Sequence, residues 1–239
     1  MVSDPPSRLS ALHLAEINVR TLFTHDAAGR LLATNEPRGR PAPRLFVVRT
    51  SSGVIWRARH DLPVAVVERL AAVIAGEPIS DDLEGPVFCL PAVRAVLEDH
   101  GPVVGVDGGP EYCFPDHVEQ VAGAVAVTSD NAHVLERWLP EWIPDVASEL
   151  PIRVVLVDGW AVSICACARL PGRATHAGIE THAAFRGRGG AVIATAAWAA
   201  AMHERRVIPL YGTSWSNRAS QRVAAKLGLL RYGASLSID

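Results

Sequence analysis

The sequence predicts a mixed α+β protein built around a mostly antiparallel sheet. The chain has 239 residues, of which 49% are hydrophobic and 20% charged, so it is long enough to bury a core without disulfides or metals. Short β-rich runs alternate along it with segments of helical apolar periodicity. In the second half, three consecutive β-rich runs are joined by short turns, which predicts an antiparallel meander flanked by helices.

The first half is predicted to be an α+β region. The β-rich runs and helical segments expected there are, in order, strands at 30–35, 44–50 and 53–59 and helices at 63–75 and 92–100. The stretch 101–115 is rich in glycine and proline, which favours a linker or inter-domain crossing. We therefore predict two domains, 1–120 and 121–239.

The second half follows the order β, α, α, β, β, β, α, β, α, β. The segments expected are a buried strand at 121–129, a helix capped by Ser129 or Asp130 and running to Trp138, a helical piece ending at Leu150, strands at 152–158, 160–170 and 174–183, a helix to Arg205, a strand at 208–215, a helix from Asn217 to Gly228 and a last strand at 231–238. Asp158-Gly159 is typical of a tight hairpin turn.

Charge and hydropathy argue against nucleic-acid and membrane partners. The chain carries 23 basic and 25 acidic residues, a net charge of −2, which leaves no basic footprint for phosphate backbones. The longest weakly polar stretch, 189–202, is shorter than the roughly 20 residues that a membrane span requires. The N-terminal segment lacks the pattern of a secretion signal. We predict a cytoplasmic protein.

The cysteines are predicted to be reduced core thiols: Cys89, Cys113, Cys165 and Cys167. A zinc site made from Cys165 and Cys167 with His176 and His182 would have suitable ligand types, but it lacks the C-x-x-C spacing of such sites. No metal is expected.

A glycine-rich loop, RGRGGA, stands where a predicted strand passes into a helix. It spans Arg186 to Ala191. Consecutive glycines let backbone N–H groups converge, and the first helical turn adds unpaired donors and a positive dipole end, so the loop could cradle a phosphate. A plain flexible turn with two solvated arginines accounts for it equally well. An RNA-binding tract does not fit a single copy in an acidic chain.

A second motif follows one helix and one strand later, in the sequence NRASQRVAAKLGL. Asn217 is a strong N-cap residue, Ser220 falls in the first turn, and Gly228 is placed to end the helix. A short, well-capped helix explains these residues, but it does not explain their fixed distance from the glycine-rich loop.

Together the two motifs resemble the GNAT superfamily of acyl-CoA-dependent N-acetyltransferases. Its pyrophosphate pattern, Gln/Arg-x-x-Gly-x-Gly/Ala, is met by Arg186, Gly189 and Ala191. Its later helix pattern is met by Asn217, Ser220, Lys226, Leu227 and Gly228. The resemblance covers residues 121–239 and implies a GNAT fold there. The first half is similar to the N-terminal region of a two-part subgroup that carries GRLLATNEP-like and DLP-like segments.

The resemblance implies acetyl-CoA as co-substrate, held at a place where two strands part. The residues implied in its binding are Ile179, Glu180 and Thr181 on the strand, Arg186, Gly187, Arg188, Gly189, Gly190 and Ala191 in the loop, and Asn217 and Ser220 on the later helix. A backbone N–H on that strand would polarise the thioester carbonyl.

Acetyl transfer to an amine also needs a base and an acid. An alkyl amine is neutral only about once in 2,500 molecules at pH 7, so a base is useful. Glu180 is the first candidate and His176, on the same strand face, the second. An ion pair of Glu180 with an arginine is the alternative. Many family members use a tyrosine as acid where this chain has Ala224, so Ser220 is the candidate acid, and Tyr211 the next.

The sequence thus predicts an enzyme that transfers acetyl from acetyl-CoA to a primary amine by direct attack on the thioester. A non-catalytic acyl-CoA-binding or regulatory module is the alternative, and transfer of a longer acyl group a third. The acceptor, a small molecule or a protein amine, is not fixed by the residues. The acids Glu141, Asp145 and Glu149 recur at helical spacing on the acceptor side, which is typical of a solvated face. A homodimer is compatible with the sequence.

Overall fold

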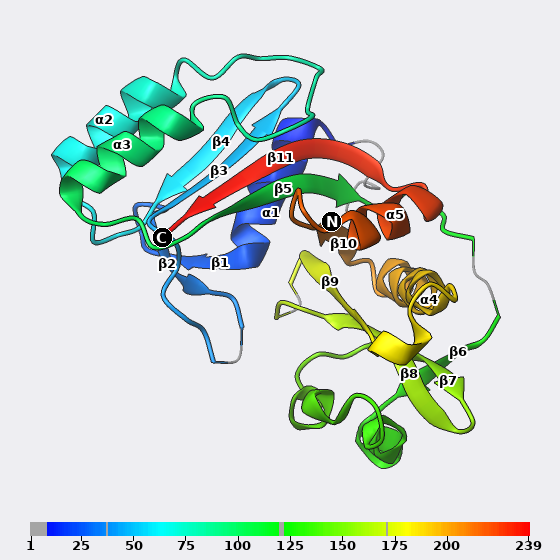
Figure 1. The fold of residues 1–239 in the computed structure, drawn as a ribbon. Coiled ribbons are helices and arrows are strands. Elements are labelled where there is room, and N and C mark those ends of the chain that lie inside the picture. The colour runs from blue at the N-terminus through cyan, green and yellow to red at the C-terminus, as the bar shows by residue number, and fades with distance from the viewer. Residues whose placement is uncertain (1–8, 37, 120–121, 171) are drawn as a thin grey trace. The chain divides into compact units, whose positions relative to one another are not determined.

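The computed structural model describes residues 9–36, 38–119, 122–170 and 172–239 and divides into two compact units (Figure 1). Among the described residues, the N-terminal unit comprises 9–112, Gly212–Arg218 and Arg231–Asp239. The C-terminal unit comprises Cys113–Tyr211 and Ala219–Leu230. The fold class is confirmed as mixed α+β with mostly antiparallel strands. The predicted division at residue 120 stays a prediction.

The N-terminal unit is a sheet covered by helices on both faces. Its elements are α1 (Ala11–Leu22), β1 (Phe23–His25), β2 (Leu31–Thr34), β3 (Leu45–Thr50), β4 (Gly53–Ala58), α2 (Val64–Ile74), α3 (Leu90–His100), β5 (Val106–Cys113) and β11 (Leu230–Ile238). The strand order is β4-β3-β11-β5. The predicted hairpin of β3 and β4 and both predicted helices are present.

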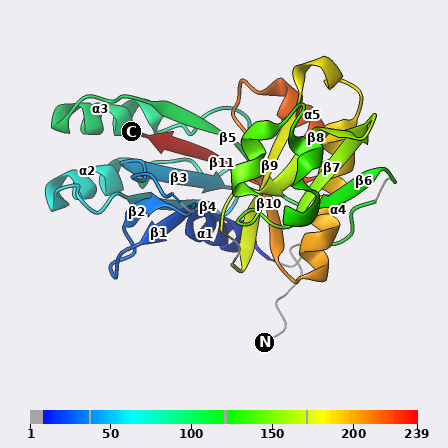
Figure 2. The ribbon, with the colours of Figure 1, turned by 90° about the horizontal axis from the view of Figure 1, so that it is seen from below.

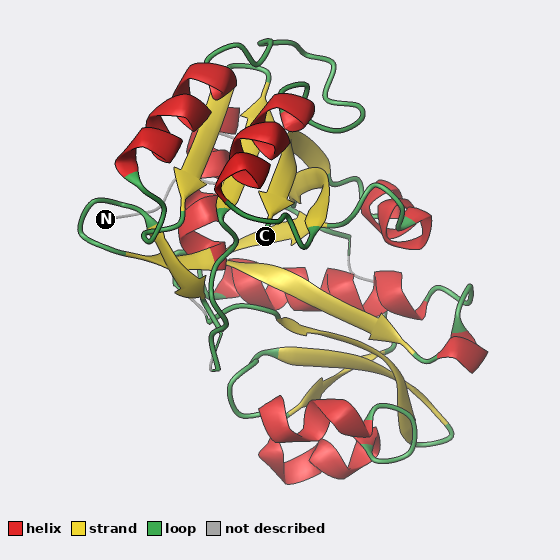
Figure 3. Ribbon diagram, turned by 60° about the vertical axis from the view of Figure 1, so that its left-hand side comes forward, coloured by secondary structure: helices red, strands yellow, loops and turns green. Residues whose placement is uncertain are grey.

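Every residue of strand β3 is buried, because other elements cover both faces of the strand. Leu45 and Val47 belong to the core formed with α2 and α3, which lie side by side (Figures 1 and 3). Phe46, on the opposite face, meets Phe23 with 5.1 Å between ring centroids. The α1 helix, whose N-cap Ser10 accepts a hydrogen bond from the His13 N–H, was not predicted from the sequence.

The expected linker at 101–115 is instead largely a strand, β5. Its glycines allow close backbone approach rather than flexibility. A Cβ at Gly108 would lie 2.3 Å from the carbonyl oxygen of Ser235, and one at Gly109 would lie 1.7 Å from that of Thr213. Glycine in this stretch therefore marks tight packing within the N-terminal unit.

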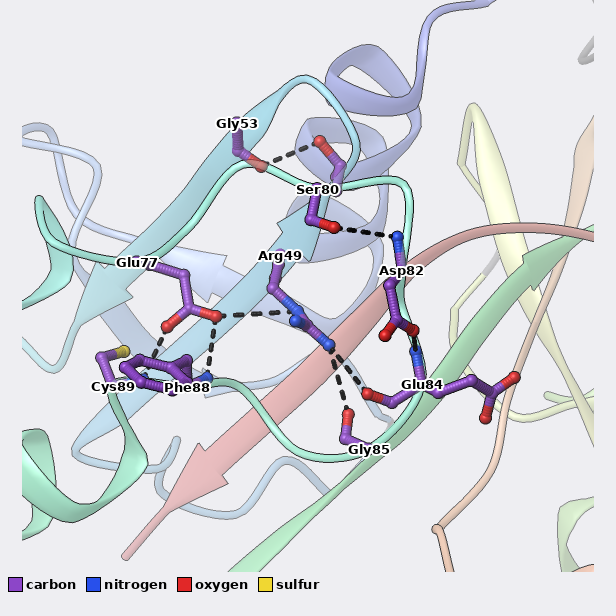
Figure 4. A network of polar contacts seen from close by, with 10 residues as sticks. Arg49, Gly53, Glu77, Ser80, Asp82, Glu84, Gly85, Phe88 and Cys89 are labelled. Atoms are coloured by element: carbon purple, nitrogen blue, oxygen red, sulfur yellow. Dashed lines mark hydrogen bonds and ion pairs between the residues drawn. The ribbon is translucent and has the colours of Figure 1, made fainter.

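A buried ion pair anchors the long connection between α2 and α3 (Figure 4). The Glu77 carboxylate accepts hydrogen bonds from the backbone N–H groups of Phe88, at 2.8 Å, and Cys89, at 2.6 Å. The Nε of Arg49, on β3, lies 3.6 Å from Glu77, and its guanidinium donates to the carbonyls of Glu84 and Gly85. Both ends of the connection are thereby tied to the central strand.

Glu77→Ala is expected to destabilise the protein by about 3–5 kcal/mol, because it leaves the buried Arg49 guanidinium without its counter-charge and removes the acceptor of the buried Cys89 N–H and the part-buried Phe88 N–H. Urea unfolding monitored by circular dichroism measures the change. The matched control is Glu84→Ala, which removes an ion pair with Arg231 from a carboxylate that is 79% exposed. That change should cost less than about 1 kcal/mol. Equal losses for both variants would contradict the anchoring role of Glu77.

The C-terminal unit is a five-stranded sheet in the order β10-β9-β8-β7-β6. Its elements are β6 (Ala124–Val127), the 3-10 helices η2 (Ser129–Leu135) and η3 (Pro140–Asp145), β7 (Ile152–Val157), β8 (Trp160–Cys167), β9 (Ala174–Thr181), the 3-10 turn η4 (Ala183–Phe185), α4 (Gly190–Glu204), β10 (Ile208–Gly212) and α5 (Arg218–Lys226). The predicted meander is confirmed, since β6 to β9 pair antiparallel in turn, and β10 joins β9 in parallel (Figure 2).

The two faces of this sheet have different coverings. Ile164 of β8 and Ile152 of β7 pack into a core with Leu135 and Leu139, from the region of η2 and η3. On the other face, the Sγ of Cys167 lies 4.0 Å from the Sδ of Met202 on α4. Helical segments lie on both sides of this sheet (Figure 3). Successive residues of a strand point to opposite faces, so residues of β8 alternate between these two coverings. Paired residues of β9 follow the same rule.

Two predictions about residues 121–150 are wrong in detail. The expected α-helices are short 3-10 helices, and Thr128 rather than Ser129 or Asp130 caps the first, in a capping box with Asn131. Prolines at 140 and 144 restrict the backbone and remove N–H donors, which keeps the second segment short. The strand β6 lies at the sheet edge and is largely exposed rather than buried.

All four cysteines are free and buried, as predicted. Burial raises the pKa of the Cys89 thiol to about 12 and that of Cys113 to about 11, so both stay protonated at neutral pH. Among the described residues, no cluster of three or more His, Cys, Asp or Glu side chains could hold a metal ion. No helix in that part of the chain is both long and apolar enough to cross a bilayer.

Candidate functional site

The glycine-rich loop adopts a conformation that glycine makes possible. Gly187 has φ +79° and Gly189 has φ +87°, in the left-handed region that other residues rarely enter. Gly189 is the N-cap of α4. The loop therefore turns sharply twice between η4 and the helix, as the sequence predicts for residues 186–191.

The first turn of α4 presents unpaired backbone donors. The first intrahelical bond runs from the Ile193 N–H to the Gly189 carbonyl, at 3.2 Å, so the N–H groups of Gly190, Ala191 and Val192 precede the helical ladder. No side chain caps this end in the described structure, and its first turn carries no acidic residue. An uncapped helix N-terminus of this kind favours an anion.

Gly190 sets the helix close against β8. A Cβ at this position would lie 3.0 Å from the Cβ of Ser163, so a larger residue would push the first turn away. The Ser163 hydroxyl is fully buried and lies 2.7 Å from the Thr181 hydroxyl on β9. The start of α4 is thereby held beside the end of β9.

The strands β9 and β10 pair only over their first halves. The Ile208 N–H donates to the Arg173 carbonyl, and the ladder ends at the pair His176–Leu210. On the β8 side, the Ala168 N–H donates to the His176 carbonyl and the His182 N–H to the Val162 carbonyl. Backbone groups of even-numbered β9 residues therefore face β8, and those of odd-numbered residues face the β10 side.

An open backbone edge follows from this register. Ile179 and Thr181 lie beyond the last pair with β10, and their backbone groups point toward that side. The Thr181 carbonyl accepts a hydrogen bond from the Arg186 Nε, at 3.1 Å. The Ile179 N–H and carbonyl have no ladder partner on that side within the described strands. The backbone of Glu180 faces β8, so Glu180 offers its side chain only.

The Glu180 side chain is held by an indole rather than by an arginine. Its Oε2 accepts a hydrogen bond from the Trp142 Nε1, at 2.8 Å, and the carboxylate is half-buried. Trp142 belongs to η3, on the face of the sheet opposite α4. The ion pair considered as an alternative for Glu180 is absent from the salt bridges of the described residues.

His176 shares the strand face of Glu180 but lies deep in the structure. It is 7% exposed, and burial lowers its pKa to about 3, with the positive charge of Arg169 as a smaller cause. The ring is therefore neutral at pH 7 and binds a proton weakly. Of the two predicted bases, Glu180 is the better suited chemically.

The two candidate acids are hydrogen-bonded to each other. The Tyr211 hydroxyl, at the end of β10, lies 2.6 Å from the Ser220 Oγ on α5. Tyr211 is 3% exposed, whereas Ser220 is half-buried, so Ser220 is the more accessible member. Ala224, one turn further along α5, is buried and offers no proton. Gly228, with φ +64°, ends the helix as predicted.

The remaining predicted residues lie at the surface. Arg186 and Arg188 are exposed, and the Arg188 guanidinium sits over the Phe185 ring at 5.2 Å. Asn217 directly precedes α5 and belongs to the N-terminal unit, where its N–H donates to the Ser214 carbonyl. The C-terminal unit thus contains the loop, the open edge, Glu180 and Ser220.

Sequence reasoning missed Trp142. A tryptophan two residues after a proline in a short 3-10 segment carries no catalytic signature. Its contact with a residue 38 positions away depends on how η3 packs over β9. The glycine at 178 was the available signal, because a strand glycine two residues before an acid leaves room for a large side chain.

No protein-family model matches the sequence, and no curated protein matches it. Among solved structures, the chain is similar to a GNAT-family acetyltransferase of Novosphingobium aromaticivorans, at 19% identity and TM-score 0.48, over 57% of this chain and 66% of that one. It is also similar to a GCN5-related N-acetyltransferase of Sphaerobacter thermophilus, at 16% identity and TM-score 0.48, over 94% and 85% of the two chains.

A third similar structure is a tandem GNAT protein from the clavulanic acid biosynthesis pathway, at 13% identity and TM-score 0.43, over 96% of this chain and 97% of that one. Two of these three structures are described as GNAT proteins and the other as a GCN5-related N-acetyltransferase.

Proposed function

We propose that this protein is an acetyl-CoA-dependent N-acetyltransferase of the GNAT type that acts by direct attack of a primary amine on the thioester. The proposal rests on two neighbouring sets of backbone groups in the C-terminal unit. The first is the N–H and carbonyl of Ile179 at the open edge of β9, and the second is the N–H groups in the uncapped first turn of α4. The first suits an amide-containing chain, and the second suits a diphosphate.

The residues present fit acetyl-CoA, which would supply the activated acetyl group. The N–H groups at the start of α4 would bind the diphosphate, with Arg186 and Arg188 adding positive charge at the exposed rim. The backbone of Ile179 would pair with the amides of the pantetheine arm. Gly190 keeps the two sites adjacent, because it lets α4 pack directly against β8.

Glu180 would accept the proton that the amine loses as its nitrogen bonds to the acetyl carbon. The carbon–sulfur bond then breaks, and the departing sulfur needs a proton because a thiol pKa near 8.5 makes it a moderate leaving group. Ser220 would supply that proton. Tyr211 would then return a proton to Ser220 through the hydrogen bond between their hydroxyls. No covalent enzyme intermediate is required.

Ser220→Ala is expected to lower kcat by about 10- to 100-fold, since general acid catalysis commonly contributes 10²–10⁴-fold and this leaving group needs less help than most. Tyr211→Phe should lower kcat less, because Ser220 keeps its hydroxyl. Ser220→Thr, which preserves the hydroxyl, is the control. Initial rates of thiol release measure all three. A larger loss of kcat for Tyr211→Phe would identify Tyr211 as the general acid. No loss of kcat in either variant would exclude both residues from that role.

The alternative function is a non-catalytic acyl-CoA-binding module, favoured by Ala224 at the position where many family members carry the acid. Calorimetry with coenzyme A, paired with thiol release from acetyl-CoA across alkylamines, amino acids, polyamines and lysine peptides, separates the two. Binding with amine-dependent turnover supports the enzyme, binding without turnover supports the module, and absence of binding rejects both. Competition between acetyl-CoA and longer acyl-CoA thioesters tests the acyl length.

The partners and compartment proposed are those that the sequence predicts: a small-molecule or protein amine as acceptor, no nucleic acid, no membrane, a cytoplasmic location and a homodimer as one available assembly. The amine panel tests the first of these, and sedimentation velocity tests the last.

A further inference from the structure

We propose that Trp142 is a positioning residue for the reaction: its indole N–H fixes the Glu180 carboxylate so that one oxygen is held and the other faces the incoming amine. The inference rests on the proposed function, because it assigns a role relative to the base of that reaction. Its starting point is the hydrogen bond of 2.8 Å from the Trp142 Nε1 to the Glu180 Oε2.

The strand makes room for the indole at Gly178. Gly178 and Glu180 are two residues apart, so they lie on the same face of β9. A Cβ at Gly178 would lie 3.5 Å from the Trp142 Cη2 and 3.1 Å from the Cβ of Ala168. The ring therefore lies along the strand beside the base, where a larger residue at 178 would crowd it.

The segment that carries Trp142 is itself fixed by packing. The Trp142 N–H donates to the carbonyl of Leu139, which is fully buried, and Val146, just beyond η3, is 3% exposed. Trp142 packs against the same core. The indole thus reaches Glu180 from a stable platform, so the direction of its N–H is set by the fold.

An indole is suited to hold a base without competing with it. Its nitrogen donates and does not accept, so it takes no proton from the amine. It also carries no formal charge, whereas an arginine at the same place would stabilise the anion by its full charge and weaken it as a base. With Oε2 occupied by Trp142, the structure gives Oε1 no donor among the described residues. Oε1 is the oxygen assigned to the amine proton.

The test is a double-mutant cycle between Trp142→Phe and Glu180→Gln. Trp142→Phe keeps an aromatic ring in η3 but removes the indole N–H together with the rest of the second ring. Trp142→Phe should lower kcat about 10-fold with acetyl-CoA, using the amine of highest rate in the panel. The KM for acetyl-CoA and the Kd for coenzyme A should not change. In the Glu180→Gln background it should have no further effect on kcat, because the group it positions is already gone.

Trp138→Phe is the control, because the Trp138 ring packs against His182, at 4.7 Å between centroids, and makes no hydrogen bond to Glu180 in the described structure. Whatever its own effect, it should add fully to that of Glu180→Gln. Full additivity for Trp142→Phe, or a changed Kd for coenzyme A with unchanged kcat, overturns the positioning role while leaving the proposed function in place. A wild-type protein that fails to bind coenzyme A overturns the proposed function instead.

A second measurement does not depend on turnover. The indole N–H signal of Trp142, assigned by its loss in Trp142→Phe, should move upfield in the ¹H–¹⁵N spectrum of Glu180→Gln, because the bond to a carboxylate is replaced by a weaker bond to an amide. A signal that does not move shows that the indole does not hold the carboxylate in solution, and it overturns the inference.

Discussion

Ala191→Asp should remove acetyl-CoA binding and leave the protein at least as stable as the wild type. The substitution places a carboxylate in the first turn of α4, where the unpaired N–H groups and the helix dipole favour negative charge. It would gain about 0.3–1 kcal/mol of stability from the dipole. It would also take donors from the diphosphate and repel it. Loss of two charge-assisted hydrogen bonds, about 3–6 kcal/mol, weakens binding about 10²- to 10⁴-fold.

Calorimetry with coenzyme A and thermal unfolding measure the two opposite effects on one variant. Ala147→Asp, at an exposed position after η3, changes the net charge equally without touching α4 and should bind coenzyme A as the wild type does. Unchanged binding in Ala191→Asp would show that the diphosphate does not dock at this helix. A loss of stability together with binding would show only that the variant misfolds, and Ala191→Asn, which is neutral, would then carry the comparison.

Glu180→Gln should lower kcat/KM for the amine by about 10²- to 10³-fold, the usual contribution of a general base. The amide still fills the space beside Trp142 but cannot accept the amine proton. Because the backbone of Glu180 pairs with β8 and not with the open edge, coenzyme A should bind with unchanged affinity. Steady-state kinetics at saturating acetyl-CoA measure the loss.

Glu141→Gln, an exposed carboxylate of the same 3-10 segment as Trp142, is the matched control and should keep wild-type kinetics. Equal activity of Glu180→Gln and the wild type would exclude Glu180 as base. His176 would not take its place readily, because its pKa of about 3 leaves it a weak proton acceptor at neutral pH.

The local structure of the C-terminal half is largely predictable because its signals are short-range. Asp158 and Gly159 adopt the positive φ values that a tight hairpin turn needs, at +49° and +81°. Gly189 and Gly228 mark a helix start and a helix end in the same way. Each of these residues acts through its own backbone, so the sequence alone identifies its role.

What the sequence missed depends on packing between distant segments. The glycines of β5 predict a linker when read alone, yet they are required by the backbone of Thr213 and Ser235, more than 100 residues away. The 3-10 helices at 129–145 have helical apolar spacing, but prolines and a capping box at Thr128 keep them short. Helix α1 does carry a local start signal, the N-cap Ser10.

The features of the candidate site also fall into two groups, those set by local sequence and those set by tertiary packing. The loop at 186–191 follows from glycine positions, and the motif spacing predicts the later helix. The hydrogen bonds between Tyr211 and Ser220 and between Trp142 and Glu180 follow only from the fold. Side-chain pairs of this kind are set by tertiary packing, so they cannot be recognised from a single sequence.

The most direct measurement is a crystal structure of the protein with coenzyme A. We expect the diphosphate within hydrogen-bond distance of the N–H groups of Gly190, Ala191 and Val192, with the pantetheine arm paired to the backbone of Ile179 and the sulfur approaching Glu180. Coenzyme A bound elsewhere, with this helix start capped by a protein side chain, would contradict it.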